Sequence, residues 1–464
     1  MAAIAETLTP VAHPDPAART EKGRAARKRV PRASLAEWSP APDRPDPADL
    51  ITGQEATRVP ELIPIRHQRM LVSPFTFYRG AAVIMASDLA SGPRSSLDVQ
   101  CCGDAHLANF GGFASPERDL VFDINDFDET HTGPFEWDVK RLATSFEIAG
   151  RARELSAREA RALAVAAARS YRLAIGEFAG MTNLKVWYAK LDLAGVLRRW
   201  QNRMTPAEVA RLEKRATKAE SKDSLNAVER LTTRVDGELR FASTPPLVVP
   251  LRDLATGIAP EEVERWVHER FRTYRRSLQP DRRRLLERYR IVDTARKVVG
   301  VGSVGTRCWI ILLLGRDDND PLVLQVKEAG ASVLEPYTGK AKMANHGQRV
   351  VEGQRFLQAA SDMLLGWAKA TTPDGTEIDY YVRQLWDWKL TANVDTMTPG
   401  ALAIYAEACG WTLARGHARS GDAIALAAYL GTSDRFEQSI ADYATRYADQ
   451  NQRDYEVVRA ALKG

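Results

Sequence analysis

Residues Cys101–Gly112 read CCGDAHLANFGG and present three polar side chains, Asp104, His106 and Asn109, in one short loop. The preceding residues, SLDVQCC, predict a short strand that delivers the chain to Gly103. An aspartate in such a loop can accept a proton from a hydroxyl nucleophile, and an asparagine offers a neutral oxygen to a hard cation. Asp and Asn are also favoured in ordinary turns, so this stretch alone supports a catalytic loop and a polar turn equally.

A second group of acidic residues follows the next predicted strand, in RDLVFDINDFDE (118–129). The carboxylates of Asp123, Asp126 and Asp128 stand where this strand ends, a position typical of Mg²⁺ ligands. The alternative is an acidic surface turn. The interleaved apolar residues weigh against that alternative, because they tether the segment to a core.

The stretch GVGSVG (300–305) spaces Gly300, Gly302 and Gly305 as G-x-G-x-x-G. A dinucleotide-binding fold would need a helix next, whereas the following TRCWIILLL predicts a strand. The pattern therefore favours a glycine-rich hairpin whose backbone N–H groups lie over nucleotide phosphates. A flexible hairpin that needs positive φ angles is the alternative.

Lys327 lies in the next predicted strand, PLVLQVKEAG (321–330). A lysine within an apolar strand must find an anion, or its burial is costly, and a nucleotide phosphate would satisfy it. Glu352 on the following predicted helix is the first candidate to hold this lysine in place, and Glu335 is the second. The alternative is an edge-strand lysine that reaches solvent. Together, the four features supply the parts that phosphoryl transfer needs.

The composition limits the number of domains, the classes of partner and the cellular compartment that this protein can have. The chain has 464 residues, enough for two or three domains, and its net charge of +5 is too small to indicate a nucleic-acid partner. Four cysteines in a chain of this length do not make a disulfide framework, which fits a reducing compartment, and the lack of a CxxC pair argues against a structural zinc site. Since neither a membrane span nor a secretory signal is evident, we expect a cytoplasmic protein without membrane partners.

The distribution of apolar, charged and turn-forming residues divides the chain into four segments. Together these segments predict an α+β fold. Residues 1–60 predict a disordered or surface-strapped basic arm, and residues 61–290 a mainly helical segment that carries both acidic loops. Residues 291–390 predict a β-rich segment, and residues 391–464 predict helices that pack back onto the first helical segment. Within the β-rich segment, residues 346–370 are expected to form one long amphipathic helix.

Several of these motifs resemble the protein-kinase-like superfamily. GDAHLANFG resembles the G-D-x-H-x-x-N catalytic loop of aminoglycoside and choline phosphotransferases, and VFDINDFDE resembles the metal-binding segment that follows it. GPFEWDVKRLATS resembles the stretch in which an aspartate, here Asp138, supports the catalytic loop. GVGSVG and LVLQVK resemble the glycine loop and the lysine strand of the small lobe.

From about Arg66 onward, the chain also resembles a bacterial family, domain of unknown function 2252 (DUF2252). The motifs that carry this second resemblance are SPFTFYRG, CCGDAHLANFG, DINDFDET, VVEGQRFLQAASD and YYVRQLWDWK.

The kinase-like resemblance implies an ATP- and Mg²⁺-dependent phosphotransferase that acts on a hydroxyl of a small molecule or a protein. Because the glycine loop and the lysine follow the catalytic loop here, the two-lobed fold would be circularly permuted, with the helical large lobe first. Asp104 would orient or deprotonate the acceptor, and Asn109 and Asp126 would hold Mg²⁺, with Asp123 as the alternative ligand.

The same resemblance implies the roles of the remaining candidates. Lys327 would pair with nucleotide phosphates, with Glu352 positioning it. The three glycines of the loop would let its backbone approach those phosphates, and His106 would brace the catalytic loop. Arg79 in SPFTFYRG could reach a phosphate or an acidic substrate group, or cap a helix.

Three other functions stay open at this point. The same fold could transfer AMP instead of phosphate, or it could bind nucleotide without catalysis. A metal-dependent phosphohydrolase is the third, for which His106, His346, His417 and Asp422 are the candidate ligands. The sequence does not name the acceptor.

Overall fold

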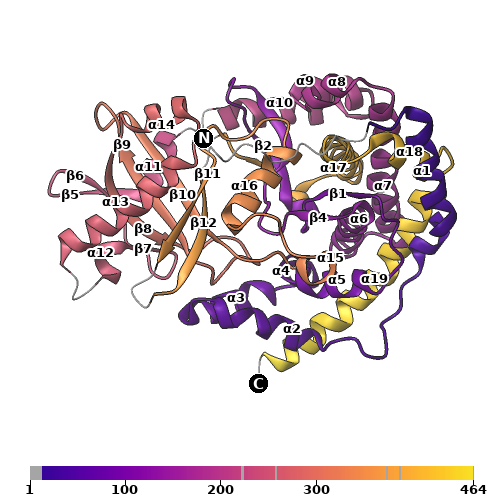
Figure 1. Ribbon diagram of the computed structural model, residues 1–464, viewed down its shortest axis with the longest axis horizontal. Helices are drawn as coiled ribbons and strands as arrows, with labels where there is room; N and C mark the ends of the chain where they lie inside the picture. Colours follow the sequence, from indigo (N-terminus) through magenta and orange to yellow (C-terminus); the bar gives the residue numbers. More distant parts are fainter. Residues whose placement is uncertain (1–12, 221–223, 256–258, 372–374, 386–387, 463–464) are drawn as a thin grey trace, which may run out of the picture.

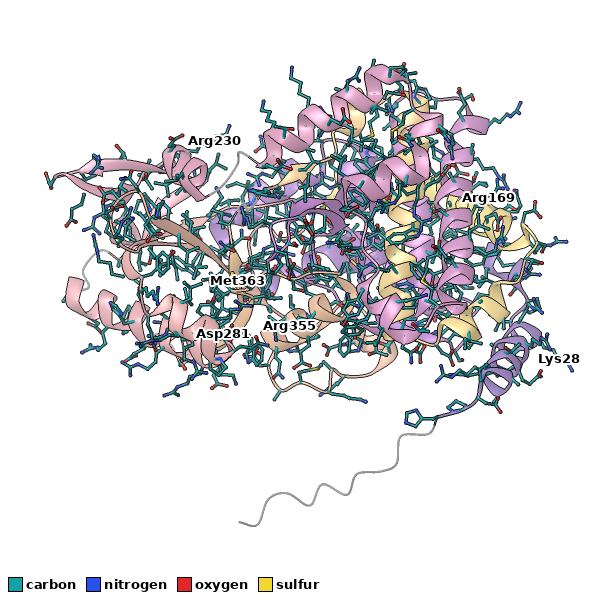
Figure 2. The ribbon with its side chains drawn as sticks, turned by 90° about the horizontal axis from the view of Figure 1, so that it is seen from above. Lys28, Arg169, Arg230, Asp281, Arg355 and Met363 are labelled. Carbon is teal, nitrogen blue, oxygen red and sulfur yellow. The ribbon has the colours of Figure 1, made fainter. Side chains whose placement is uncertain are left out.

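A computed structural model describes residues 13–220, 224–255, 259–371, 375–385 and 388–462. The protein is a mixed α+β molecule with a β-rich part at one end of its long axis and a helical part at the other (Figure 1). Figure 2 shows the same division from above, with Arg230 and Asp281 marking the β-rich part and Lys28 and Arg169 the helical part.

The β-rich part is built on a six-stranded antiparallel sheet in the order β11-β12-β10-β9-β8-β7. Apolar side chains line both faces of its central strands, which explains why the sequence of β9 is continuously apolar instead of alternating. Its strands are β7 (Val248–Pro250), β8 (Arg290–Lys297), β9 (Cys308–Leu314), β10 (Pro321–Ala329), β11 (Gly366–Thr371) and β12 (Glu377–Gln384).

Helices from before residue 290 cover this sheet. Phe271 and Leu286 pack on one face with Leu313, whereas Val228 packs on the other face with Leu312. The β-rich part therefore begins near residue 224, earlier than the boundary of 291 that we expected, because these amphipathic segments bury their apolar sides on the sheet. They are α11 (Ser224–Leu231), the hairpin β5 (Thr232–Val235) and β6 (Glu238–Phe241), α12 (Leu251–Leu254), α13 (Pro260–Arg276) and α14 (Pro280–Leu286).

Helix α16 (His346–Leu357) lies between the two parts (Figure 1) and is shorter than the sequence indicated. The chain leaves the helix at Gln358, and Gly366–Thr371 forms strand β11 instead of a further helical stretch. A Cβ at Gly366 would lie 2.5 Å from Ser277 Oγ, so this strand packs closely against the end of α13. The prediction of one helix over residues 346–370 is therefore wrong.

The helical part is organised around α6 and α7, which pack against each other and against the two long C-terminal helices. Helix α7 begins at the predicted capping box, where Ser156 and Glu159 exchange hydrogen bonds. Its helices are α6 (Phe135–Ala152), α7 (Ala157–Ala179), α8 (Asn183–Tyr188), α9 (Leu193–Trp200), α10 (Pro206–Glu220), α17 (Pro399–Ser420), α18 (Ala423–Leu430) and α19 (Arg435–Ala461). Among the described helices, none combines the length and apolar character that a membrane-spanning segment requires.

Short strands connect the helical part to the acidic loops. Strand β1 pairs with β4, and β3 pairs with β2, which also pairs with β13. The loop CCGDAHLAN therefore begins at the end of β1, and the acidic segment begins at the end of β3, as predicted. The strands are β1 (Asp98–Cys101), β2 (Phe110–Ala114), β3 (Leu120–Ile124), β4 (His131–Pro134) and β13 (Leu390–Thr391).

The N-terminal segment from residue 13 onward packs along the helical part. Helix α1 lies against α18, and Ala26, Leu35 and Ile51 are buried. Residues 1–12 of the predicted basic arm lie outside the described residues. The helices before β1 are α1 (Pro16–Arg29), α2 (Pro47–Gly53), α3 (Ile63–Met70), α4 (Pro74–Gly80) and α5 (Ala82–Ala90).

Candidate functional site

Lys327 joins the β-rich part to the acidic loop that follows β3. Its side chain is buried, and Nζ lies 2.6 Å from Asp128 Oδ2 and 3.8 Å from Asp126 Oδ1. Tyr381, directly opposite Lys327 in the register of β12, donates its hydroxyl to Asp128 Oδ1 at 2.6 Å. The anion that a lysine in an apolar strand requires is thus supplied, in this structure, by two carboxylates from the other part of the molecule.

The two carboxylates differ in how well the protein compensates their charge. Burial would raise the pKa of Asp128, but Lys327 and the Tyr381 hydroxyl outweigh it and lower that pKa. Burial and the neighbouring charge of Asp128 raise the pKa of Asp126. Burial opposes the charge on Lys327, yet the two carboxylates raise its pKa well above the ordinary value. The negative charge of Asp126, whose side chain is 36% exposed, is therefore the less well compensated of the two. A further cation would stabilise it more than it would stabilise Asp128.

The loop after β1 is hydrogen-bonded to Asp138 on α6. The backbone N–H groups of Cys102 and Gly103 donate to the two oxygens of Asp138, at 2.6 Å and 3.0 Å. Gly103 has a φ of 81°, and a Cβ there would collide with the carbonyl oxygen of Glu129. The loop conformation therefore requires glycine at this position and packs directly against the acidic segment.

Asp104, in this loop, forms an ion pair with an arginine from α6. The guanidinium of Arg141, also from α6, lies 2.5 Å from Asp104 Oδ1, and the Tyr78 ring lies 4.5 Å beneath that guanidinium. Burial raises the pKa of Asp104, although Arg141 and Arg79 oppose the shift. Arg141 thus holds Oδ1 of this carboxylate, and Oδ2 lies 3.7 Å from His106 Nε2.

His106 and Asn109 bind within the loop itself. His106 Nδ1 accepts the backbone N–H of Ala108 at 3.2 Å, and burial lowers the pKa of His106 well below its ordinary value. Asn109 Nδ2 donates to the Asp104 carbonyl at 2.8 Å, and the Asn109 carbonyl accepts the N–H of Asn125 at 2.8 Å. Asn109 thus links the two acidic loops, which leaves its amide oxygen as the atom that could hold a cation beside Asp126.

The glycine hairpin between β8 and β9 is fastened by the N-terminal segment. Gly300 and Gly305 have φ angles of 72° and 94°, which only glycine adopts readily. The Val59 N–H donates to the Gly305 carbonyl at 2.8 Å, and Arg69 donates to the Gly300 carbonyl at 2.9 Å. Arg58 in addition donates to the Val304 carbonyl. Residues 58–80 therefore form a clasp that fixes this hairpin.

Arg79, at the end of α4, lies against the glycine hairpin through its backbone. Its carbonyl oxygen is 3.3 Å from the position a Cβ would take on Gly302. Burial lowers the pKa of Arg79, and the charges of Asp104 and Asp126 oppose that shift. The Arg79 backbone thus lies against the glycine hairpin, and the charges of Asp104 and Asp126 act on its guanidinium.

Two of the expected residues do not join this group. Asp123 is 1% exposed and binds Arg415 Nη2 through both oxygens, at 2.6 Å and 2.8 Å, and its Oδ2 also accepts the Ala359 N–H. Glu352 accepts a hydrogen bond from Gln348 on its own helix, at 2.5 Å. The face of α16 near Lys327 instead presents Arg349, which donates to the Asp128 carbonyl at 2.8 Å. The expected Lys327–Glu352 pair is thus replaced by the Lys327–Asp128 pair.

The remaining acidic and histidine candidates are dispersed. Glu335 lies 3.8 Å from His346 and 3.9 Å from Arg349, His417 lies 3.2 Å from Asp138, and Asp422 caps α18. Within the described ranges, no three His, Cys, Asp or Glu side chains cluster so as to hold a metal ion by themselves. A site made of Asn109 and Asp126 fits Mg²⁺, which binds few protein oxygens and completes its coordination with water and substrate phosphates.

Sequence reasoning missed Arg141, Tyr381 and Arg383. Arg383 donates to the Asn125 carbonyl at 3.0 Å, so it anchors the same acidic segment as Tyr381 does. Arg141 follows Asp138 by three residues on α6, a spacing that puts both side chains on one helix face toward the loop after β1, and this signal could have identified it.

The comparisons with known proteins agree with this description at the level of the family. No curated protein and no solved structure matches the chain. One family model matches residues 58–461, and its description is "Uncharacterized protein conserved in bacteria (DUF2252)". That match includes the clasp, both acidic loops, the glycine hairpin and Lys327. The chain therefore belongs to the DUF2252 family.

Proposed function

We propose that this protein is an ATP- and Mg²⁺-dependent phosphotransferase that phosphorylates a hydroxyl group of a small molecule or a protein. One observation carries the proposal: Lys327 Nζ lies 2.6 Å from Asp128 and 3.8 Å from Asp126, next to the loop of Asp104 and Asn109. Phosphoryl transfer needs this combination of a phosphate-pairing cation, metal ligands and a base.

The arrangement of the β-rich part supports a kinase-like reading of the site. A glycine hairpin, a lysine strand, a helix and two further strands follow one another along the chain as β8, β9, β10, α16, β11 and β12. In protein kinases, the lysine likewise stands on the strand after the glycine-rich hairpin. Here the catalytic loop precedes this unit in the sequence, so the proposed fold is a circular permutation.

In the proposed phosphoryl transfer, each residue of the site has a separate role. Asp104 accepts the proton of the acceptor hydroxyl, the hydroxyl oxygen forms a bond to the γ-phosphorus of ATP, and the bond from that phosphorus to the bridging oxygen breaks. The electron pair of the broken bond leaves with ADP. Lys327 neutralises charge on the nucleotide phosphates. Asn109 and Asp126 would hold Mg²⁺, which supplies further neutralisation of the phosphate charge when bound.

Titration calorimetry with ATP, with and without Mg²⁺, tests this proposal. We expect the wild type to bind ATP in a Mg²⁺-dependent manner and the Lys327→Ala and Asp126→Ala variants to lose that binding. Lys369→Ala is the matched control, because Lys369 is an exposed lysine of the same sheet, paired with Glu377. If the wild type binds no ATP at millimolar concentration, or if the Lys327→Ala variant binds as tightly as the wild type, the proposal is wrong.

Product analysis then separates the two group transfers that one such site could perform. We expect ADP as the nucleotide product once an acceptor is supplied. Release of pyrophosphate would instead indicate AMP transfer from the same bound nucleotide.

A further inference from the structure

The end of helix α4 is enclosed by the two halves of the candidate site. On one side, the Arg79 carbonyl oxygen closely approaches Gly302, and a Cβ on Gly80 would lie 3.6 Å from a Val301 methyl group. On the other side, the Tyr78 carbonyl accepts Arg141 Nη2 at 3.0 Å, and Arg141 holds Asp104. The backbone of residues 78–80 is therefore positioned both by the glycine hairpin and by Arg141, the ion-pair partner of Asp104.

The guanidinium of Arg79 differs from the other arginines of this region. Arg141 pairs with Asp104, Arg349 donates to three carbonyls, and Arg383 donates to Asn125 and Gln325. Nε of Arg79 and Nε of Arg349 are both buried without a hydrogen-bond partner among the described residues. Arg349 is held through its other nitrogens, whereas no hydrogen bond or ion pair among the described residues involves the Arg79 side chain. An unsatisfied buried donor is costly, so a site that retains one is suited to a ligand that will accept its hydrogen bond.

The groups around Arg79 indicate what that ligand is. In the proposed function, Asp104 accepts the proton of the attacking hydroxyl. Asp126 would hold the Mg²⁺ that binds the nucleotide phosphates. The group that passes from the nucleotide to the hydroxyl is the γ-phosphoryl group, whose equatorial oxygens carry the charge during transfer. A planar guanidinium matches such oxygens with two parallel hydrogen bonds.

We propose that Arg79 contacts the phosphoryl group in transit and stabilises its charge, as a catalytic arginine supplied by the same chain. This inference rests on the proposed function and adds a residue to it. Arg79 gives and takes no proton: the hydroxyl proton still goes to Asp104, the new oxygen–phosphorus bond forms as the old one breaks, and the electron pair leaves with ADP. Arginines in this role accelerate phosphoryl transfer by about 10³-fold or more.

A transition-state mimic tests the inference without knowledge of the acceptor. Binding of Mg²⁺–ADP is measured by calorimetry with and without aluminium fluoride, which occupies the place of the transferring group. We expect aluminium fluoride to tighten ADP binding to the wild type by about 100-fold or more, as transition-state analogues do. In Arg79→Lys we expect most of this tightening to be lost while the affinity for Mg²⁺–ADP alone stays unchanged.

Arg284→Lys is the control, because Arg284 on α14 is an exposed arginine whose partner is Glu287. It should retain the tightening. Equal tightening in the wild type and in Arg79→Lys would overturn the inference, and so would a wild type that binds Mg²⁺–ADP without any tightening. A wild type that binds no Mg²⁺–ADP would overturn the proposed function itself.

A measurement on the wild-type protein covers the case in which Arg79→Lys does not fold. Modification of arginines by phenylglyoxal is mapped by peptide mass spectrometry in the presence of Mg²⁺–ADP, with and without aluminium fluoride. We expect the transition-state mimic to protect Arg79 beyond the protection that Mg²⁺–ADP gives. Identical modification of Arg79 in both states would contradict the inference.

Discussion

At the residue scale, Asp123 near the end of β3 and Asp126 just after this strand have different surroundings. Asp123 and Arg415 are each 1% exposed and are bound to each other, which makes their pair part of the interior. Asp126 is more exposed, and the protein does not fully compensate its charge. Although they are three residues apart in sequence, the two aspartates should therefore differ in how much the protein is destabilised when their charge is removed.

Substitution of each aspartate by asparagine tests this difference. Asp123→Asn leaves Arg415 buried without its counter-charge and should lower the free energy of unfolding by about 3–5 kcal/mol. Asp126→Asn removes a charge that burial disfavours and should change that free energy by less than about 1 kcal/mol while abolishing Mg²⁺-dependent ATP binding. Urea denaturation and calorimetry measure the two effects. Equal destabilisation by both variants would contradict the expected difference.

Glu129 should make the stability of the protein depend on pH near neutrality. Burial raises the pKa of Glu129 to about 7, from an ordinary value of 4.5, and the charges of Asp128 and Asp104 add to the shift. Because the folded state holds this proton more tightly, its contribution to stability is lost as the pH rises from the ordinary value through about 7. At pH 8, Glu129→Gln should therefore be more stable than the wild type by up to about 3 kcal/mol.

Urea denaturation between pH 5 and pH 8 measures this effect as the difference between the two proteins. Glu129 Oε2 accepts the Val333 N–H at 2.8 Å, and the glutamine oxygen can accept the same hydrogen bond. The comparison therefore isolates the charge. A stability difference that does not change with pH would show that Glu129 is not the titrating group.

At the scale of secondary-structure elements, the glycine hairpin depends on its backbone conformation. Gly305 has a φ of 94°, and a Cβ there would lie 3.1 Å from side-chain carbons of Arg58. Gly305→Ala should cost about 1–2 kcal/mol of stability and weaken ATP binding, because the left-handed region is strained for alanine. Gly176→Ala is the control: its Cβ would meet no atom within 4 Å on α7, so stability should rise by up to about 1 kcal/mol without an effect on ATP.

Thermal unfolding and calorimetry of the two alanine variants measure these effects. If the Gly305→Ala and Gly176→Ala variants bind ATP equally well, the hairpin does not contribute to the nucleotide site.

Local signals predicted several elements correctly, and tertiary contacts decided the others. The capping box of α7 and the Asp236–Gly237 turn, with φ angles of 52° and 81°, are encoded within a few residues. The end of α16 is not, because residues after Leu357 have helical composition but Gly366 packs against α13.

The same limit applies to the candidate site. Motif spacing selected Asp104, Asn109, Asp126 and Lys327 as candidates, because each lies close to the end of a predicted strand or within one. It could not show that Asp128, 199 residues away, takes the place of Glu352 beside Lys327, since that exchange depends on which face of α16 meets the sheet. Likewise, the choice between Asp123 and Asp126 depended on Arg415, which is distant in sequence.

At the scale of the whole molecule, the N-terminal segment connects elements from both ends of the chain. Arg44 donates to Asp88 on α5 and to Asp454 on α19, with distances of 2.6 Å to 2.9 Å, and all three side chains are largely buried. Arg44→Ala would leave two buried carboxylates without their counter-charge. It should lower the free energy of unfolding by about 3–5 kcal/mol.

Arg24→Ala serves as the control for Arg44→Ala, since Arg24 is exposed on α1 and should change that free energy by about 0.5 kcal/mol or less. Chemical denaturation of the two variants measures the contrast. A small effect of Arg44→Ala would mean that the N-terminal segment does not hold α5 and α19 together.

The central claim is that the two parts of the chain build one nucleotide site, and the most direct measurement is a crystal structure with a non-hydrolysable ATP analogue and Mn²⁺. We predict an anomalous Mn²⁺ signal between Asn109 and Asp126, phosphate oxygens within hydrogen-bond distance of Lys327 Nζ, and the γ-phosphate beside Arg79. A nucleotide bound elsewhere, or a bound nucleotide whose phosphates contact neither Lys327 nor a metal held by Asp126, would contradict the claim.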